Sequence, residues 1–409
     1  MERLKLISAL AWRNLWRNPR RTGLVLVAVS IGVWSMLSFT ALLQAWSASS
    51  LQAALENLTG QGQVHASGYL DNPGVARSMP PPAGVLRSML DGMEVDRWAP
   101  RVRVPAAVQS AYKTWPVSLV GIDPERERGL SFIATAVHVG RGLDGTDGTG
   151  ILLGRKLAKR LHTGIGKRVV LMSQNSAGGM VERGFKVVGL FLAPPQIEDR
   201  YVFIGLARAQ TMLGMGENIT GVSFGLHRIA ELDAFIGKLR GAAPGMDVQP
   251  WQILRPLTKA MNQLSSSFIQ VWIVIIFVLM SFGIVNTLLM SLHERVRELA
   301  LLQALGLRPR LIFAQVVLES ALVVLLGIAI GVLAAAATVL AFHRGIDLGF
   351  LARGSEWLGA GRVLYPQLDV AEFAAISALV WALGVAAGLL PIWRIIRRVP
   401  VEAINRGQT

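Results

Sequence analysis

Cysteine is absent from the 409 residues, and charged residues are few. Without a thiol, the chain cannot form disulfides, ligate zinc through sulfur or use a cysteine nucleophile. Asp, Glu, Lys and Arg make up 16% of the sequence, whereas soluble domains average roughly 25%. Hydrophobic residues make up 52%, and the mean hydropathy is +0.46. These values together indicate a membrane protein.

The sequence also lacks a complete catalytic or nucleotide-binding motif. GVSFG (Gly221–Gly225) has the pattern G-x-S-x-G, but Ser223 lies in a β-type run without the helix that follows a hydrolase nucleophile. TGIGKR (Thr163–Arg168) has Arg where a phosphate loop needs Ser or Thr. HERVR (His293–Arg297) has Arg where a zinc protease needs its second His. We therefore expect no catalytic residue, no metal site and no cofactor bound by this chain; any ATP would be bound by another chain.

Most of the positive charge lies beside apolar runs. Residues 1–21 carry six Lys or Arg against one acid, residues 293–310 four against two, and residues 394–409 four against one. The long segment 47–267 is only mildly basic for its length. A nucleic-acid-binding face would gather charge on one face of a folded domain. We therefore expect no nucleic-acid partner, and membrane lipids instead.

Four apolar stretches are long enough to cross a bilayer, which takes about 20 residues. They are residues 22–46, 268–292, 311–342 and 370–393. The first is longer than the apolar core of a signal peptide, about 7–15 residues, so we expect a retained span. The fold class predicted is an α-helical membrane protein with four transmembrane helices and a large α+β domain inserted between the first and second spans.

The distribution of Lys and Arg predicts the orientation, because short cytoplasmic flanks carry the excess of these residues. The cytoplasmic parts are then an N-terminal helix over 1–21, a loop with a coupling helix over 293–310 and a tail over 394–409. The domain 47–267 and the loop 343–369 then lie on the outer side.

Segment 47–267 has the pattern of a folded α+β domain. Short β-type runs recur with helical stretches between them. The expected strands are Val117–Asp123, Arg168–Ser173, Phe185–Phe191, Tyr201–Gly205 and Val222–Leu226, and the expected helices are Arg155–His162 and Ala230–Arg240. The Pro- and Gly-rich piece Asp71–Gly84 is expected to be an exposed loop.

Two features inside the spans suggest helix contacts. GIAIG places Gly327 and Gly331 one turn apart, and GVAAG does the same for Gly384 and Gly388. Such small-residue faces let helices approach closely in lipid, so we expect a tight pair of the third and fourth spans, with the first two freer to meet a substrate or second subunit. Glu319 lies within the third span. An ionisable group there faces protein or water; we favour a hydrogen bond to a neighbouring helix over a gating role.

The loop between the second and third spans contains a segment with a charged half and an apolar half. From Leu292 the sequence is charged, and from Leu299 to Leu305 it is apolar nearly all round. Gly306 fits a helix C-terminus and Pro309 the first turn of the next helix. This helix could lie flat on the lipid or dock into a partner, and its mixed charge favours the partner. The residues expected to make this contact are Glu294, Arg295, Arg297, Glu298, Leu299, Leu302, Leu305 and Gly306.

Three segments together resemble the permease subunits of ABC transporters of the MacB/FtsX/LolC–LolE, or mechanotransmission, family. They are LAWRNLWRNPRRT (Leu10–Thr22), ERVRELALLQALGLRPRLIFAQVVLES (Glu294–Ser320) and PIWRIIRRVPVEAINR (Pro391–Arg406). In the outer segment, GIDPERE (Gly121–Glu127) and GILLGRKLAKRLHTGIGKRVVLMS (Gly150–Ser173) are similar to the lipoprotein-releasing branch and to MacB.

The resemblance implies a permease dimer, of identical or sister subunits, in the bacterial inner membrane. Two cytoplasmic ABC ATPase subunits, which carry ATP and Mg²⁺, would bind through the helix 294–306. The large domain would lie in the periplasm and meet a carrier or an adaptor there. The cargo would be a lipid-anchored or periplasmic molecule; the alternatives are MacB-like efflux through an outer-membrane duct and FtsX-like regulation of a cell-wall hydrolase.

Overall fold

The computed structural model describes residues 13, 17, 19–294, 309–347, 363–367 and 369–398. They form two compact units. One consists of long helices and includes Met1–Ala48, Asn262–Gly349 and Arg362–Thr409; the described residues of the other are Ser49–Met261. Each unit is described by itself below.

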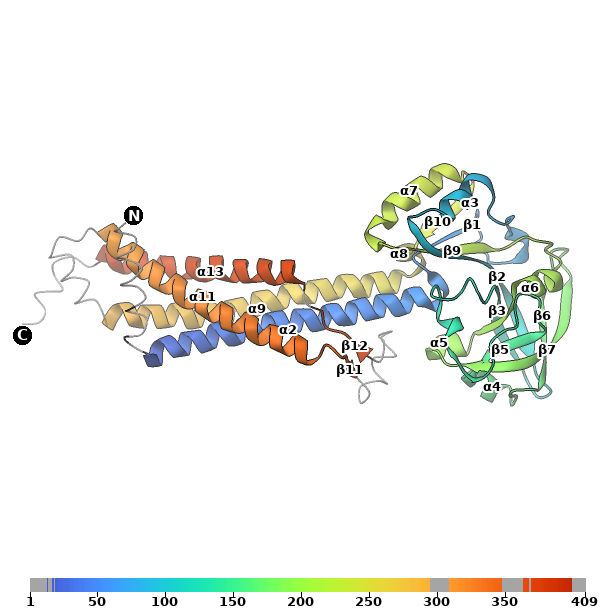
Figure 1. The fold of residues 1–409 in the computed structure, drawn as a ribbon, viewed down its shortest axis with the longest axis horizontal. Helices are drawn as coiled ribbons and strands as arrows, with labels where there is room; N and C mark the ends of the chain where they lie inside the picture. Colours follow the sequence, from blue (N-terminus) through green and yellow to red (C-terminus); the bar gives the residue numbers. More distant parts are fainter. Residues whose placement is uncertain are drawn as a thin grey trace, which may run out of the picture. The chain divides into compact units, whose positions relative to one another are not determined.

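Four long helices run side by side in the helical unit (Figure 1). They are α2 (Pro19–Ala54), α9 (Pro256–Glu294), α11 (Pro309–Ala341) and α13 (Val370–Arg398), with a pair of two-residue strands, β11 (Ile346–Asp347) and β12 (Val363–Leu364). Three of these helices begin at a proline, whose missing N–H costs nothing in the first turn. The prediction that Pro309 lies in the first turn of the helix after residues 293–310 is thereby confirmed.

Three of these helices are long and apolar enough to cross a membrane. The apolar stretches are Thr22–Thr59, Pro256–Asn286 and Phe313–Ala341; α13 has a shorter one, Val370–Ala386. Large apolar side chains such as Leu24, Phe268 and Phe282 are exposed on the outside of this unit. Lipid tails are the solvent that such a surface requires.

The glycine face of α11 packs against α2. A Cβ added to Gly327 would lie 2.8 Å from the Cβ of Val29, and one added to Gly331 would lie 2.8 Å from that of Val33. The expectation that these two glycines face the fourth helix is therefore wrong. A glycine pattern identifies a face that admits close approach, but not which neighbour occupies it.

The third and fourth helices nevertheless contact each other, as expected. On α13, Gly384 faces α11: a Cβ there would lie 3.3 Å from Cγ1 of Val324. The first helix is not free of the bundle, because α2 also contacts α9 through Gly32 and Met280. Two hydrogen bonds join α2 to α11, from Ser30 Oγ to Gly327 O (3.0 Å) and from Trp34 Nε1 to Thr338 Oγ1 (2.9 Å).

Segment Ser49–Met261 contains a ten-stranded mixed sheet with short helices. Its strands are β1 (Gly62–Ala66), β2 (Val95–Gln109), β3 (Thr114–Ile122), β4 (Val137–Gly140), β5 (Gly150–Gly154), β6 (Arg168–Gln174), β7 (Met180–Phe191), β8 (Tyr201–Gly205), β9 (Gly221–Leu226) and β10 (Met246–Pro250). Its helices are α3 (Gly84–Leu90), α4 (Arg155–Arg160), α5 (Pro195–Glu198), α6 (Leu206–Leu213), α7 (Leu232–Ala242) and α8 (Trp251–Leu254), with single turns η1 (Leu55–Thr59), η2 (Val75–Arg77), η3 (Phe132–Ala134) and η4 (Ile229–Glu231).

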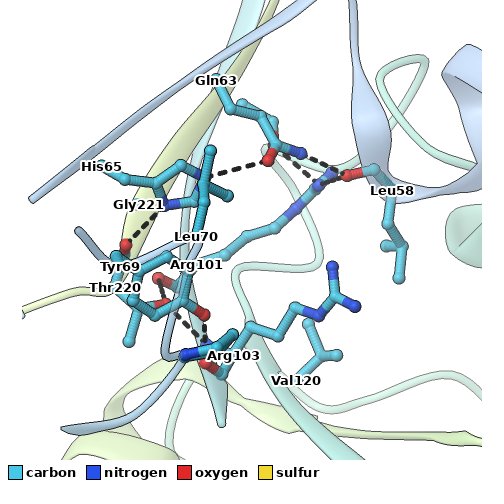
Figure 2. Close-up of a pocket in the computed structure, with 12 residues that line it drawn as sticks. Leu58, Gln63, His65, Tyr69, Leu70, Arg101, Arg103, Val120, Thr220 and Gly221 are labelled. Carbon is cyan, nitrogen blue, oxygen red and sulfur yellow. Dashed lines mark hydrogen bonds between the residues drawn. The ribbon is translucent and has the colours of Figure 1, made fainter. Parts of the chain in front are cut away.

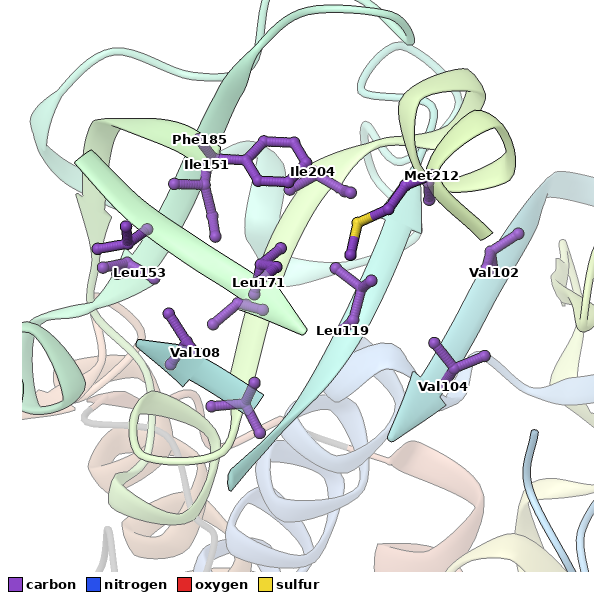
Figure 3. Packing of buried hydrophobic residues seen from close by; sticks show 14 of the residues in the cluster. Val102, Val104, Val108, Leu119, Ile151, Leu153, Leu171, Phe185, Ile204 and Met212 are labelled. Atoms are coloured by element: carbon purple, nitrogen blue, oxygen red, sulfur yellow. The ribbon is translucent and has the colours of Figure 1, made fainter. Parts of the chain in front are cut away.

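Strand β2 connects two halves of this sheet. Its first half pairs with β9, its second half pairs with β6, and β3 pairs along residues 101–109. One core, which includes Val102, Leu119 and Phe185, lies among the strands around β5–β8 (Figure 3). A second core, which includes Phe224 and Phe235, lies under α3 and α7. A displacement of β2 would therefore be felt in both halves.

The predicted strands and helices of this segment are confirmed. Strands β6, β7, β8 and β9 cover four of the expected runs, and β3 covers the fifth as far as Ile122. Helix α4 ends at Arg160, short of the expected His162, and α7 begins at Leu232 after the turn η4. Strands β1, β2, β4, β5 and β10 were not expected. Asp71, Asn72 and Pro73 are exposed as predicted, but Val75 and Met79 in the same piece are buried. Met79 forms a β-bridge with Ile219, which ties this piece to the sheet.

Candidate functional site

Most of the predicted partner-binding residues lie outside the described residues: Arg295, Arg297, Glu298, Leu299, Leu302, Leu305 and Gly306. Glu294 is the last residue of α9. Glu319 lies half-buried in α11, and Gly388 lies in α13. The roles assigned to these residues remain predictions.

A different candidate site lies in the α+β domain, at the end of α2. After Ala54 the chain passes through the turn η1, in which Asn57 and Leu58 leave the helical conformation. Leu58 has φ 66°, a conformation that a non-glycine residue rarely adopts. The carbonyl groups at a helix end have no partner within the helix. Here three side chains donate to them: Gln63, Arg101 and Arg255. We call these three residues and the carbonyls of Asn57, Leu58 and Thr59 the helix-end clamp.

Arg101 is the centre of the clamp and is fully paired. Its Nε and Nη2 donate to the two carboxylate oxygens of Glu127 at 2.6 and 2.8 Å. Its Nη1 donates to Leu58 O and, at 2.8 Å, to Ser223 Oγ. The side chains of Arg101 and Glu127 are 7% and 0% exposed. A bidentate pair in such a place has a fixed geometry, so η1 is held by a group that cannot rotate freely.

Gln63 is the second side chain that binds the carbonyl groups of η1, and it contacts His65 in turn. Gln63 Nε2 donates to Leu58 O at 3.0 Å and to Thr59 O at 2.9 Å. Its Oε1 lies 2.9 Å from His65 Nε2, and His65 Nδ1 lies 2.7 Å from Thr220 O. Burial lowers the pKa of His65 below its ordinary value of 6.5. Figure 2 shows this chain of contacts from Thr220 through His65 and Gln63 to Leu58.

Arg255 connects the start of α9 to the same turn. It immediately precedes Pro256, the first residue of α9. Its Nε donates to Thr59 Oγ1 at 2.9 Å, and its Nη2 donates to Asn57 O at 3.1 Å. The helix that enters the domain and the helix that leaves it are therefore joined at one turn.

A cavity of about 190 Å³ adjoins the clamp, and Leu58, Gln63, His65, Tyr69, Arg101 and Ser223 are among the residues that line it (Figure 2). The hydroxyl of Ser223, the serine of the G-x-S-x-G pattern, accepts from Arg101 in the middle of β9. Ser223 thereby contributes to the fixed position of the Arg101 guanidinium. The arrangement as a whole can transmit a displacement of α2 or α9 to β1, β2 and β9.

Sequence reasoning did not single out Arg101, Glu127, Gln63, His65 or Arg255. The sequence feature that could have identified two of them is a polar residue within a strand that is otherwise buried. Gln63 and His65 are polar residues in a strand whose pattern is otherwise that of a buried one. Buried polar groups need partners, yet the sequence does not say which residue supplies them.

Two family models match the chain. The MacB-like periplasmic core domain matches residues 22–241, and the FtsX-like permease C-terminal model matches residues 271–400. The first of these covers more than half of the sequence.

Curated relatives fall into two groups. The lipoprotein-releasing system transmembrane protein LolC of Xylella fastidiosa (strain Temecula1) is 23% identical over 320 residues, which is 75% of this chain and 77% of the relative. LolE of Haemophilus influenzae is 22% identical over 329 residues, or 75% and 76%. The macrolide export ATP-binding/permease protein MacB of Bordetella avium is 32% identical over 133 residues, 32% of this chain and 18% of that relative.

Among solved structures, the periplasmic region of MacB from Actinobacillus actinomycetemcomitans matches 50% of this chain and 97% of its own, with a TM-score of 0.35 and 12% identity. The extracellular domain of the ABC-type transporter YknZ matches 46% and 98%, with a TM-score of 0.33 and 13% identity.

Proposed function

Because the chain belongs to the MacB/FtsX/LolC–LolE family of ABC-type permeases, we propose that it transmits ATP-driven motion from the cytoplasm to its periplasmic domain to move a lipid-anchored or periplasmic cargo. It is an inner-membrane protein whose α+β domain lies in the periplasm. The observation that carries the proposal is the helix-end clamp. Helix α2 leads directly into η1, and Arg255, which immediately precedes α9, donates to Asn57 O of the same turn.

A lipoprotein-release type of cargo has the broader support. The relatives named for lipoprotein release, LolC and LolE, match 75% of this chain and 77% and 76% of their own length. In this proposal an anchored lipoprotein reaches the first two spans from the membrane and passes to a periplasmic carrier. MacB-like efflux with an adaptor and an outer-membrane duct is the alternative, supported by the match of the MacB-like core domain over residues 22–241. FtsX-like regulation is supported only by the C-terminal match over 271–400.

The proposed assembly contains two permease subunits, identical or sister, and a cytoplasmic ABC ATPase dimer. ATP and Mg²⁺ are bound by the ATPase, because this sequence has no complete phosphate loop. The helix 294–306 docks on the ATPase, with Leu299, Leu302 and Leu305 in an apolar groove. The helix α13 forms the fourth span, for which its apolar stretch Val370–Ala386 gives support.

The ATPase contact is tested by copurification from native membranes. We expect a tagged full-length chain to retain an ABC ATPase, and Leu302→Glu to lose it, because the substitution puts an unpaired carboxylate in an apolar interface. Val85→Glu, at a residue 62% exposed in the periplasmic domain, is the matched control and should retain the ATPase. Recovery of the wild type without any ATPase would refute the docking proposal, and so would ATPase binding by Leu302→Glu at the wild-type level.

The kind of cargo is tested on the same native complex. Mass spectrometry of the bound material should identify a triacylated protein if the complex releases lipoproteins. An adaptor and an outer-membrane channel among the copurified proteins would instead support efflux. A cell-wall hydrolase as the main periplasmic partner would support the regulatory alternative.

A further inference from the structure

His65 lies between oxygen atoms on both sides of its ring. Nδ1 is 2.7 Å from Thr220 O, and Nε2 is 2.9 Å from Gln63 Oε1. The Gln63 amide cannot be turned round, because its Nε2 donates to two carbonyl groups of η1. A neutral imidazole carries one N–H, whereas the imidazolium carries two. In either neutral tautomer, one ring nitrogen therefore faces an oxygen atom with no proton between them.

We propose that His65 is a proton-operated latch on the helix-end clamp: protonation completes the His65–Gln63 hydrogen bond and holds Gln63 against η1, and deprotonation loosens that hold. This inference rests on the proposed function, because it regulates the clamp through which motion would pass. The periplasm is a compartment in which pH follows the surroundings, so such a latch would adjust the stiffness of the connection between α2 and the sheet.

The residues around His65 keep the ring itself in place. Tyr69 stacks on the ring with centroids 4.6 Å apart. On the neighbouring strand, a Cβ at Gly221 would lie 2.2 Å from His65 Nδ1, so the ring occupies the space that a side chain would need. Gln63 and His65 both border the cavity of about 190 Å³, but stacking on Tyr69 and the close approach of Gly221 fix the ring, whereas Gln63 is held through the hydrogen bonds of its amide. The part that moves in the latch is therefore Gln63, not His65.

The charges that face His65 come from two strands, β10 and β2. Asp247 of β10 is its cross-strand neighbour, and Arg101 and Arg103 belong to β2. Burial is the largest influence and lowers the pKa of His65; Thr220 O and Asp247 raise it, and the two arginines lower it. Burial raises the pKa of Tyr69 above its ordinary value of 10.0, so the phenol stays neutral. Glu127 is occupied by its bidentate pair with Arg101.

The direction of the switch follows from what changes between its two states. Tyr69 and Gly221 hold the ring in both states, so the difference between the states lies in the hydrogen bond to Gln63. Only the engaged state offers the second acceptor to the imidazolium, so protons favour engagement. Because of the burial, we expect the change below the ordinary His pKa of 6.5.

Hydrogen exchange of the full-length chain in lipid nanodiscs tests the latch. The peptide that covers Leu58–Gln61 is followed from about pH 7.5 to about pH 5, corrected for the intrinsic pH dependence of exchange. We expect protection to rise roughly tenfold as pH falls, the effect of one charge-assisted hydrogen bond. His65→Phe, which keeps a ring on Tyr69 but has no N–H, should remove this rise. His227→Phe, at a side chain 60% exposed, should keep it.

Two further measurements make every outcome decisive. Gln63→Met has a similar shape without the amide, and should show low protection of η1 at all pH values even if His65→Phe does not fold. Nitrogen-15 spectra of histidine-labelled chain should show His65 as an imidazolium at the acidic end. The latch is refuted if His65 stays neutral throughout, or if His65→Phe keeps the wild-type pH profile. These experiments need neither ATPase nor cargo, so a negative result leaves the proposed function standing, and loss of the ATPase contact leaves the latch standing.

Discussion

At the scale of single residues, the Arg101–Glu127 pair decides the stability of the clamp. Removing one partner of a buried ion pair leaves an uncompensated charge and costs about 3–5 kcal/mol. We expect Arg101→Met to destabilise the periplasmic domain by about that amount, because Glu127 is 0% exposed. Thermal unfolding of the full chain in nanodiscs measures this. The control Arg228→Met breaks an exposed pair with Glu231 and should change stability by about 0–1 kcal/mol.

A double variant separates the charge from the contact. Arg101→Met with Glu127→Leu replaces both ions by apolar groups, and should recover much of the lost stability. If the double variant is as unstable as Arg101→Met, the hydrogen bonds of Arg101 to Leu58 and Ser223 are what stabilise the domain.

His65 predicts a pH dependence of global stability that is separate from the latch. Burial lowers the pKa of His65 in the folded domain below 6.5, its ordinary value. A group of this kind contributes full stability above the unfolded pKa, and the contribution is lost as pH falls toward the folded pKa. We therefore expect the melting temperature to decrease below about pH 6.5, less steeply in His65→Phe. An equal slope in both proteins would assign the loss to other groups.

At the scale of the elements, the close contact of α2 with α11 depends on glycine. Gly331→Leu forces a side chain into the place where Val33 and Ser30 O already lie within 2.8 Å of the ideal Cβ. Overpacking of this kind costs about 1–3 kcal/mol, so we expect a lower melting temperature of the helical unit in nanodiscs. Gly23→Ala, where the added Cβ meets nothing within 4 Å, is the control and should be neutral. The double variant Gly331→Leu with Val33→Ala should recover part of the loss.

Five of the ten strands of the sheet were predicted from the sequence; β1, β2, β4, β5 and β10 were not, and no pairing between strands was predicted. Alternating and continuous apolar runs located β3, β6, β7, β8 and β9, because their periods are local properties of the chain. The mutual contacts are set by distant residues: Arg101 and Glu127 are 26 positions apart, and Arg101 and Ser223 are 122 apart. No spacing rule connects such positions. For the same reason, Gly327 was recognised as a contact residue and assigned the wrong neighbour.

The clamp was missed for a further physical reason. Side-chain donors to the carbonyl groups at a helix end have no sequence signature comparable to the capping box at a helix start. After α2, the residue with the left-handed conformation is Leu58 rather than a glycine. Glycine follows only at Gly60, with φ 64°. The sequence therefore indicated where the apolar run of the first span stops, but not the residue at which the helix α2 ends.

At the scale of the whole molecule, continuity of the helices is the central property. Helix α2 reaches from Pro19 to Ala54, where it leads into η1, and α9 reaches from Pro256, next to Arg255 of the clamp, to Glu294. A helix is stiff along its axis because each residue adds a backbone hydrogen bond. In the proposed function, a displacement that an ATPase produces at the cytoplasmic ends of these helices would reach η1. The hydrogen bonds of the helix-end clamp would then determine how much of that displacement is passed to the sheet.

Arg255→Met tests that coupling directly. The variant loses two hydrogen bonds to Thr59 Oγ1 and Asn57 O, each worth about 1.5–3 kcal/mol when charge-assisted. We expect local opening of η1 to increase about tenfold or more, while the helical unit is unchanged. In the reconstituted complex, ATP hydrolysis should continue near the wild-type rate while cargo released per ATP falls several-fold. Arg240→Met, whose guanidinium donates to Val248 O away from η1, is the matched control and should keep normal coupling. If Arg255→Met instead lowers ATP hydrolysis and cargo release in equal proportion, force does not pass through the clamp.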